Sequence, residues 1–313
     1  MVVKEKSLEA IKNNPHLDNI VALKSPWTGP KRGYETIEWV TELCHMVRKL
    51  RKERVDVAID FKGDIRSILI AYLSGARRRI SYAIRGGGFL LSDIVPYEAD
   101  IHEIDKNVKL LTPLGIASYG STMELNVTDE DLATVERILL GQKVDLSRWT
   151  VAIHYGGASH FKRWGTERFV SLAEAITEGN STNVLVFGGH HDGKTPGFET
   201  NPEKGIFLMP DMTICQMAAT FRRCHLLVCN DSGPMHVGLA VGTPTVAIFG
   251  PTFPDRFGPK DLQKNRVVRP QISCSPCWHP DKAIGCLKSD CLISIEVERV
   301  LVAVNELSHG LWP

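Results

Sequence analysis

The turn Asp231-Ser232-Gly233 carries residues whose types and spacing suit phosphate chemistry. It follows a predicted strand, and Pro234 then suits the first position of a helix because its missing N–H would be unbonded there. The free N–H groups of a first helical turn, with the positive end of the helix dipole, favour a bound diphosphate. His236 lies one turn into this helix. Taken alone, such a turn more often only caps a helix.

Two further loops are expected beside this turn. A second predicted strand ends in Gly250-Pro251-Thr252, and a loop that contains Gly157 and Lys162 leaves a third strand. The carboxyl ends of neighbouring parallel strands share one edge of the sheet, where open α/β sheets bind ligands. Alone, Lys162 would be interpreted as a solvated surface lysine. The shared edge instead favours a cation close to the bound diphosphate.

Two other classes of nucleotide-binding protein are excluded by the sequence. The stretch Gly188 to Thr195 satisfies G-x-x-x-x-G-K-S/T after a predicted strand, which would indicate a phosphate-binding NTPase. That motif needs a helix at its lysine and threonine, and Pro196-Gly197 prevent one. No G-x-G-x-x-G follows a strand, so a dinucleotide oxidoreductase has no support.

A cysteine cluster lies near the end of the chain. Cys274, Cys277, Cys286 and Cys291 form C-x2-C-x8-C-x4-C, and four thiolates could close a tetrahedral structural zinc site. C-x2-C is a strong half-site, but C-x4-C is loose, so thiols packed beneath a loop or a single disulfide remain alternatives. The other cysteines are interpreted as buried thiols; they are Cys44, Cys215, Cys224 and Cys229.

The elements that position these residues follow an α/β pattern, because short β-branched runs alternate with longer amphipathic stretches. Strands are expected at 20–23, 55–60, 79–84, 150–154, 183–187, 226–229 and 245–249, and helices at 37–52, 103–111, 128–140, 166–177, 213–222 and from 234. A polar segment after the helix 128–140 suggests two domains, 1–145 and 146–313. The second contains a complete doubly wound unit, whereas the first opens in a predicted helix, as if one βα unit were missing.

Composition excludes several classes of protein. A chain of 313 residues with 43% hydrophobic content can fill two cores. Its net charge of +1 gives no support for a nucleic-acid partner. No apolar run is long enough to cross a bilayer, and the first residues lack the pattern of a signal peptide, so the expected location is the cytoplasm.

Several of these stretches resemble glycosyltransferase family 9, the lipopolysaccharide heptosyltransferases. The run DSGPMHVGLAVGTPTVAIFGPT is similar to the family signature, D-S/T-G-x-x-H followed by a small-residue helix and F/Y-G-P-T. KRWG, from Lys162 to Gly165, resembles the family's K-x-W segment, and Phe187-Gly188-Gly189 its next glycine turn. In the first half, AIDFKGDIRS, SGARRRISY and the segment 102–116 also fit. The resemblance covers nearly the whole chain.

The resemblance implies a GT-B fold, in which two Rossmann-like doubly wound domains face a cleft. The donor would bind the C-terminal domain and the acceptor the N-terminal one. The implied reaction is an inverting, metal-independent transfer of a heptose or related sugar from a nucleotide-diphosphate donor, ADP-heptose above all. The implied acceptor is a lipopolysaccharide core or another lipid-linked molecule, at the cytoplasmic face of the inner membrane. No cofactor would be required for catalysis.

Residue roles follow from position in these motifs. The resemblance implies that Lys162 is the cation at the diphosphate and that Asp231 belongs to the catalytic centre with it. Donor binding would fall to Gly157, Asp192, Ser232, Gly233, His236 and Thr252. Asp192 stands where the family usually has a glutamate for the nucleoside, which departs from the pattern. Trp164 is expected in the core, and Trp278 is expected to pack.

One departure concerns the general base. The family opens with a strand and a Gly-Asp turn whose aspartate is the proposed base, and this sequence has no such turn before its first predicted helix. Gly63-Asp64 mimics the turn, but the segment after it matches a later unit of the family. Two hypotheses therefore stand: a transferase, or a donor-binding module of the same fold with impaired catalysis.

Overall fold

The structure, a computed structural model, describes residues 1–23, 36–116, 120, 122–157, 159–178, 182–188, 197–278 and 289–308. The chain divides into two compact units. The first unit comprises Met1–Leu8 and Leu17–Ser121, and the second comprises Glu9–His16 and Thr122–Pro313. The division thus falls before the helix expected at 128–140, whereas the sequence suggested a boundary after it.

The second unit is built on a six-stranded parallel sheet with the order β11-β10-β9-β6-β7-β8. Its four inner strands are buried along their whole length. Such continuous apolar runs are typical of parallel strands covered on both faces. The strands are β6 (Trp149–His154), β7 (Thr182–Phe187), β8 (Ile206–Leu208), β9 (Leu226–Asn230), β10 (Thr245–Ile248) and β11 (Arg266–Val268).

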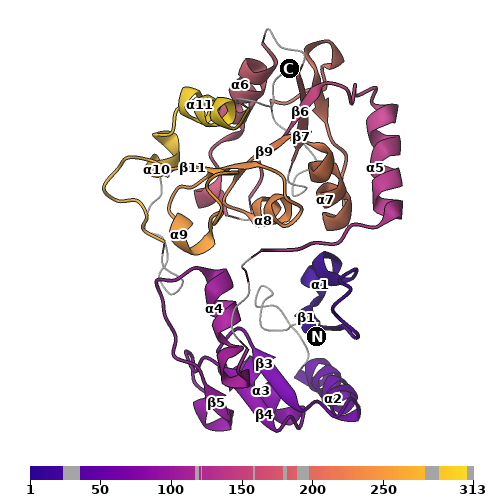
Figure 1. The fold of residues 1–313 in the computed structure, drawn as a ribbon, viewed down its shortest axis with the longest axis vertical. Helices are drawn as coiled ribbons and strands as arrows, with labels where there is room; N and C mark the ends of the chain where they lie inside the picture. The colour runs from indigo at the N-terminus through magenta and orange to yellow at the C-terminus, as the bar shows by residue number, and fades with distance from the viewer. Residues whose placement is uncertain are drawn as a thin grey trace. The chain divides into compact units, whose positions relative to one another are not determined.

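Helices cover both faces of this sheet (Figure 1). On one face, α6 (Thr166–Thr177) and α11 (Val297–Ser308) bury residues such as Phe169 and Val300 in one apolar cluster. On the other, α5 (Asp129–Gly141), α7 (Ile214–Arg223) and α8 (Gly233–Ala240) contribute to a second cluster. Shorter helices are α9 (Pro254–Phe257), α10 (Asp290–Ile293), η3 (His160–Lys162) and η4 (Pro202–Lys204).

The helix α5 belongs to the second unit for a packing reason. Val135 and Leu139 are buried in the same cluster as Ala219 and Phe221 of α7. Its start was visible in the sequence, because Thr128 and Asp131 form a reciprocal capping box. A polar segment after a helix therefore does not by itself mark the end of a domain.

The first unit contains two parallel sheets. One pairs β1 (Val2–Lys4) with β2 (Val21–Leu23), and the other has the order β3-β4-β5. The three strands of the second sheet are β3 (Val57–Asp60), β4 (Arg78–Ser81) and β5 (Asp93–Ile94). The helices are α2 (Thr36–Lys52), α3 (Ile65–Leu73), α4 (Glu103–Lys109), η1 (Gly88–Leu90) and η2 (Thr112–Leu114). The helix α1 (Glu5–Ile11) begins in this unit, and its residues from Glu9 onward are assigned to the second.

Two sequence-based expectations are wrong in this unit. The chain opens with the strand β1 rather than with a helix, because pairing of Val2 with Val21 stabilises a strand too short to show a pattern. Cys44 is exposed on α2, whereas Cys215, Cys224 and Cys229 are buried as expected. Burial raises the pKa of the Cys224 thiol to about 12, so it is an inert apolar side chain.

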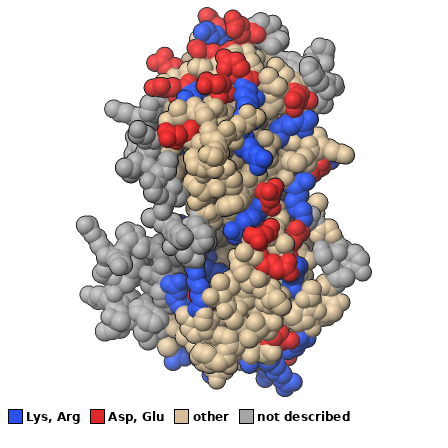
Figure 2. All heavy atoms as spheres, turned by 90° about the vertical axis from the view of Figure 1, so that its left-hand side faces the viewer, with Lys and Arg blue, Asp and Glu red and all other residues tan. Residues whose placement is uncertain are grey.

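Charges of both signs are mixed on one face of the molecule. Figure 2 shows Lys and Arg interspersed with Asp and Glu over the face that it presents. No helix among the described residues combines the length and the apolar character needed to cross a membrane.

Candidate functional site

The end of β9 leads directly into the N-terminus of α8. The side chain of Ser232 does not cap the helix, and its hydroxyl instead donates to the carbonyl of Asn230 at 3.2 Å. Gly233 is exposed, and a Cβ added there would meet nothing within 4 Å. The space beside Gly233 at the start of α8 is therefore open. The N–H of Met235 bonds to the carbonyl of Ser232 at 3.1 Å and Pro234 has no N–H, so Gly233 carries the first-turn amide that could meet an anionic ligand.

Three predicted residues meet beside this turn. Asp231 is 4% exposed, and its Oδ2 accepts a bond from Lys162 Nζ at 2.8 Å and one from Thr252 Oγ1 at 2.6 Å. Lys162 follows β6, Asp231 follows β9, and Thr252 follows β10. Because these strands are adjacent, their carboxyl ends bring the three side chains to one edge of the sheet.

The strand order explains why this edge can bind a ligand. From β6 the chain proceeds through β7 and β8 to one side, then returns with β9 and continues outward to β10 and β11 on the other side. The order in which the chain adds strands therefore reverses between β6 and β9, which is the switch point of the sheet. Open α/β sheets bind ligands in the crevice at such a point. Lys162 and Asp231 come from the two strands that border it.

Asn230, the last residue of β9, positions the loop that carries Lys162. Its side chain is fully buried; Nδ2 donates to the carbonyls of Tyr155 at 2.9 Å and Gly156 at 3.1 Å. Its Oδ1 accepts from the backbone N–H of Trp164 at 3.0 Å. The side-chain amide of Asn230 thus hydrogen-bonds to the backbone at both ends of the loop. Sequence reasoning missed it, although a polar residue at the end of a buried strand was a visible signal.

An aromatic side chain flanks Lys162. The ring of Trp278 lies 5.8 Å from Lys162 Nζ and makes an edge contact with Phe257 at a centroid distance of 5.7 Å. The N–H groups of Cys277 and Trp278 donate to the carbonyl of Pro251 at 2.9 and 2.8 Å. Trp278 therefore packs against Phe257, as expected, and also lies beside Lys162. Trp164 lies in the core as expected, 1% exposed.

The remaining predicted residues lie nearby or outside the described residues. The carbonyl of Gly157 accepts a bond from Arg163 Nε at 2.8 Å, in the loop that carries Lys162. His236 is half-buried in α8. Asp192 and Cys286 lie outside the described residues.

Three of the four cysteines expected at a zinc site lie among the described residues. Cys274 and Cys277 are exposed and Cys291 is buried. Within the described part of the chain, no group of three or more His, Cys, Asp or Glu side chains could hold a metal ion. The three described cysteines are therefore not gathered around one point.

Asp64, which mimics the Gly-Asp turn of the family, caps α3. It accepts hydrogen bonds from the backbone N–H groups of Arg66 and Ser67 and pairs with Lys62 at 3.2 Å. Burial alone would raise the pKa of Asp64, but these bonds, led by the side chain of Arg66, lower it to about 2. So weakly basic a carboxylate is unsuited to removing a proton from a hydroxyl group.

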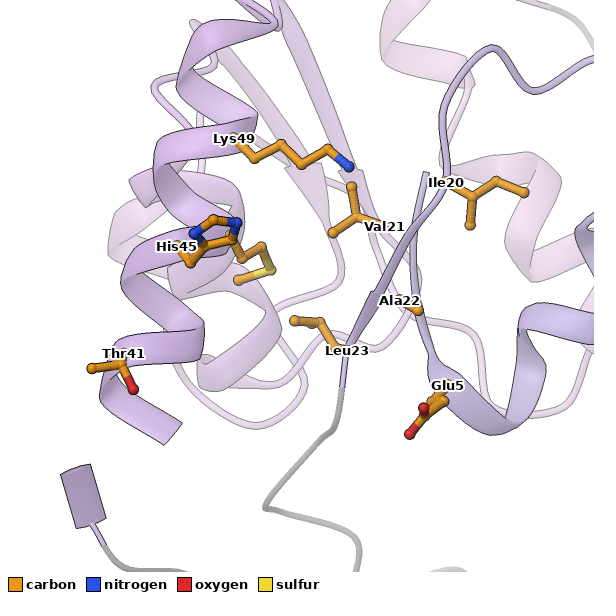
Figure 3. A pocket seen from close by; sticks show the side chains of 9 residues that line it. Glu5, Ile20, Val21, Ala22, Leu23, Thr41, His45 and Lys49 are labelled. Atoms are coloured by element: carbon orange, nitrogen blue, oxygen red, sulfur yellow. The ribbon is translucent and has the colours of Figure 1, made fainter. Parts of the chain in front are cut away.

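A separate hollow lies in the first unit. It has a volume of about 560 Å³, and Figure 3 shows His45 and Lys49 of α2 facing Val21 and Leu23 of β2 across it. None of the residues expected from the motifs lines it.

Comparison with known proteins agrees with the geometry. The model of glycosyltransferase family 9 (heptosyltransferase) matches residues 43–288. Lipopolysaccharide heptosyltransferase 2 of Escherichia coli is 27% identical over 291 residues, covering 88% of this chain and 81% of that protein. Lipopolysaccharide heptosyltransferase 3 of Escherichia coli is 22% identical over 263 residues, covering 80% and 73%.

Solved structures share the fold. A family 9 glycosyltransferase from Veillonella parvula superposes with a TM-score of 0.83 at 22% identity, over 99% of this chain and 88% of that one. The ADP-heptose lipopolysaccharide heptosyltransferase II of Escherichia coli superposes with a TM-score of 0.74 at 19% identity, over 99% and 89%. These similarities confirm the expected α/β fold of the GT-B type.

Proposed function

We propose, since the chain belongs to glycosyltransferase family 9, that this glycosyltransferase moves a heptose or related sugar from a nucleotide-diphosphate donor to a lipopolysaccharide core or similar lipid-linked acceptor. ADP-heptose is the favoured donor, because a solved relative from Escherichia coli is named for it. The proposed place of action is the cytoplasmic face of the inner membrane.

One observation carries the proposal. The ammonium group of Lys162, held by Asp231 at 2.8 Å, lies at the switch point of the sheet, and the open N-terminus of α8 follows Asp231 in the chain. Both features present positive charge. A diphosphate bound there would receive backbone N–H bonds from the helix and an ion pair from the lysine.

The proposed reaction inverts the configuration at the anomeric carbon. The acceptor hydroxyl attacks that carbon from the face opposite the diphosphate, a new C–O bond forms, and the bond to the nucleoside diphosphate breaks. Negative charge then accumulates on the departing phosphate oxygen, where Lys162 and the first turn of α8 stabilise it. Because the lysine supplies this charge, the proposed mechanism requires no metal ion. The hydroxyl proton passes to a carboxylate base, a role for which Asp64 is unsuited.

The decisive experiment compares ADP binding by calorimetry in the wild type and in Lys162→Ala. We expect affinity to fall at least about tenfold, because a hydrogen bond to a charged group is lost. Lys204→Ala removes an exposed lysine of the same unit and serves as the control, with unchanged affinity. Equal affinity in all three proteins would refute the site.

Turnover distinguishes the second hypothesis. The wild type is assayed with ADP-heptose and an acceptor that carries the lipopolysaccharide core. Release of ADP that depends on the acceptor supports the transferase. Binding of ADP without any transfer would instead identify a donor-binding module of the same fold.

A further inference from the structure

Three apolar side chains form an exposed face of α3. Ile65, Leu69 and Tyr72 are spaced four and three residues apart, so they lie on one side of the helix. Their exposed fractions are 39%, 38% and 48%, whereas Ile68 and Ala71 on the other side are buried in the unit. This helix therefore turns one apolar face to the interior and a second one outward.

The turn η1 extends this face. Phe89 is 84% exposed. A Cβ added to Gly87, two residues earlier, would lie 2.9 Å from Ile65 Cδ1, which puts the start of the turn directly against α3. Arg79 connects the end of this turn to the end of α3. Its guanidinium lies 5.6 Å from the ring centre of Tyr72, and its Nε donates to the carbonyl of Leu90 at 2.6 Å.

We call these four side chains, Ile65, Leu69, Tyr72 and Phe89, the α3–η1 patch. Singly exposed apolar residues are ordinary on protein surfaces, whereas a contiguous group with exposed aromatic rings marks an interaction surface.

Arginines border the α3–η1 patch. Arg66 follows Ile65 in the helix, and the carbonyl of Arg85 accepts a bond from the N–H of Ile65 at 3.4 Å. At the other end, Arg79 donates to the carbonyl of Arg77 at 3.2 Å. Arg66, Arg77 and Arg85 are exposed. The chain carries a net charge of only +1, so this is a local concentration of positive charge.

Two acidic residues lie near these arginines. Asp64 is 5% exposed and pairs with Lys62 and Arg66. Asp93 is occupied by Arg78, with an Nη2–Oδ1 distance of 2.7 Å. Basic side chains therefore outnumber these two carboxylates along the border of the α3–η1 patch.

We propose that the α3–η1 patch and its arginines dock the first unit onto an anionic phospholipid surface. Exposed aliphatic and aromatic side chains enter the boundary between headgroups and acyl chains, and arginines beside them pair with lipid phosphates. A second copy of the chain fits less well, because a symmetric contact through this surface would bring both sets of arginines together.

This inference deepens the proposed place of action, the face of a membrane, and rests on the proposed function in that respect, although none of its residues belongs to the site around Lys162. Docking on a membrane would bring the chain to a lipid-linked acceptor. The experiment is therefore carried out without donor or acceptor, and ADP binding is measured separately in every variant.

The test measures co-sedimentation with vesicles of phosphatidylglycerol and phosphatidylethanolamine in equal parts, and with pure phosphatidylcholine vesicles. The wild type is expected to bind the anionic vesicles and to dissociate as salt is raised. The double substitution Leu69→Gln with Phe89→Gln should weaken partitioning at least tenfold. A separate double substitution, Arg77→Gln with Arg85→Gln, should weaken partitioning relative to the wild type by about fivefold for each arginine removed.

Leu262→Gln with Val302→Gln is the matched control, since these side chains of the second unit are 58% and 55% exposed. It should bind vesicles like the wild type, and all variants should keep wild-type ADP affinity.

Three outcomes would overturn the proposal. The first is equal partitioning of the wild type and both patch variants, and the second is equal binding to anionic and neutral vesicles. The third is a concentration-dependent dimer, seen by light scattering, that Leu69→Gln with Phe89→Gln abolishes, because a second copy would then cover the patch. Circular dichroism checks that each variant is folded. If Leu69→Gln with Phe89→Gln does not fold, Arg77→Gln with Arg85→Gln alone tests the proposal.

Discussion

Lys162 and Asp231 form an ion pair with an Nζ–Oδ2 distance of 2.8 Å, although 69 residues separate them in the chain. The same carboxylate oxygen accepts a bond from Thr252. This contact is a consequence of strand order, because β9 lies between β6 and β10 and all three strands end at one edge. A buried carboxylate thereby fixes where the ammonium group of Lys162 lies.

Asp231→Asn tests the role of this ion pair. The amide can still accept a bond from Thr252, but it no longer carries the charge that orients Lys162. We expect the transfer rate at saturating donor to fall at least about tenfold, as when one preorganised group at a developing charge is lost. The measurement is steady-state kinetics, with Asp261→Asn, an exposed position of the same unit, as control. Wild-type rates in Asp231→Asn would show that the ion pair does not orient the lysine.

Asn230→Ala tests the amide that holds the loop of Lys162. Three hydrogen bonds are lost, and the N–H of Trp164 and two carbonyls remain buried without them. The free energy of unfolding should fall by about 2 to 4 kcal/mol. Urea denaturation measures it, and Asn305→Ala, on the exposed side of α11, should change it by less than about 0.5 kcal/mol. A similarly small change in Asn230→Ala would contradict the positioning role.

The meeting of Lys162, Asp231 and Thr252 was predictable because glycine turns and polar residues follow apolar runs in the sequence. Parallel strands then leave little choice about which edge those residues share. Asn230 was not predicted, since its role depends on the distance between two ends of a loop. Side-chain geometry of that kind has no periodic signal in the sequence.

Local patterns were also insufficient where tertiary contacts decide. The strand β1 has three residues and exists because Val2, Val3 and Lys4 pair with β2. The helix α5 was recognised from its cap, but its assignment to the second unit depends on Val135 and Leu139 packing with residues of α7. In both cases the deciding partner lies far away in the chain.

Gly63→Ala tests a backbone position of the first unit. Gly63 has φ of +67°, and an added Cβ would collide with the carbonyl oxygen of Tyr82, a backbone atom that cannot easily move. Gly75 has φ of +86° but open space around it, so Gly75→Ala carries only the conformational cost, about 1 kcal/mol. Gly63→Ala should lower the free energy of unfolding by at least about 1 kcal/mol more. Equal effects in urea denaturation would show that the collision is relieved at no cost.

The pH dependence of stability tests the hydrogen bonds of Asp64. Its folded-state pKa of about 2 lies below the ordinary value of 3.8, so the folded chain binds this proton less tightly than the unfolded chain. The stabilisation is therefore fully present above about pH 4 and is lost as the pH falls toward 2, and its size is about 2 kcal/mol.

Urea denaturation between pH 5 and pH 2 measures this loss in the wild type, in Asp64→Asn and in Asp56→Asn, an exposed position of the same unit. Asn cannot titrate, so the wild type and Asp56→Asn should each lose about 2 kcal/mol more than Asp64→Asn over this range. Parallel profiles for the wild type and Asp64→Asn would mean that the bonds from Arg66, Ser67 and Lys62 do not favour the charged carboxylate. The cap of α3 would then stabilise the unit through geometry alone.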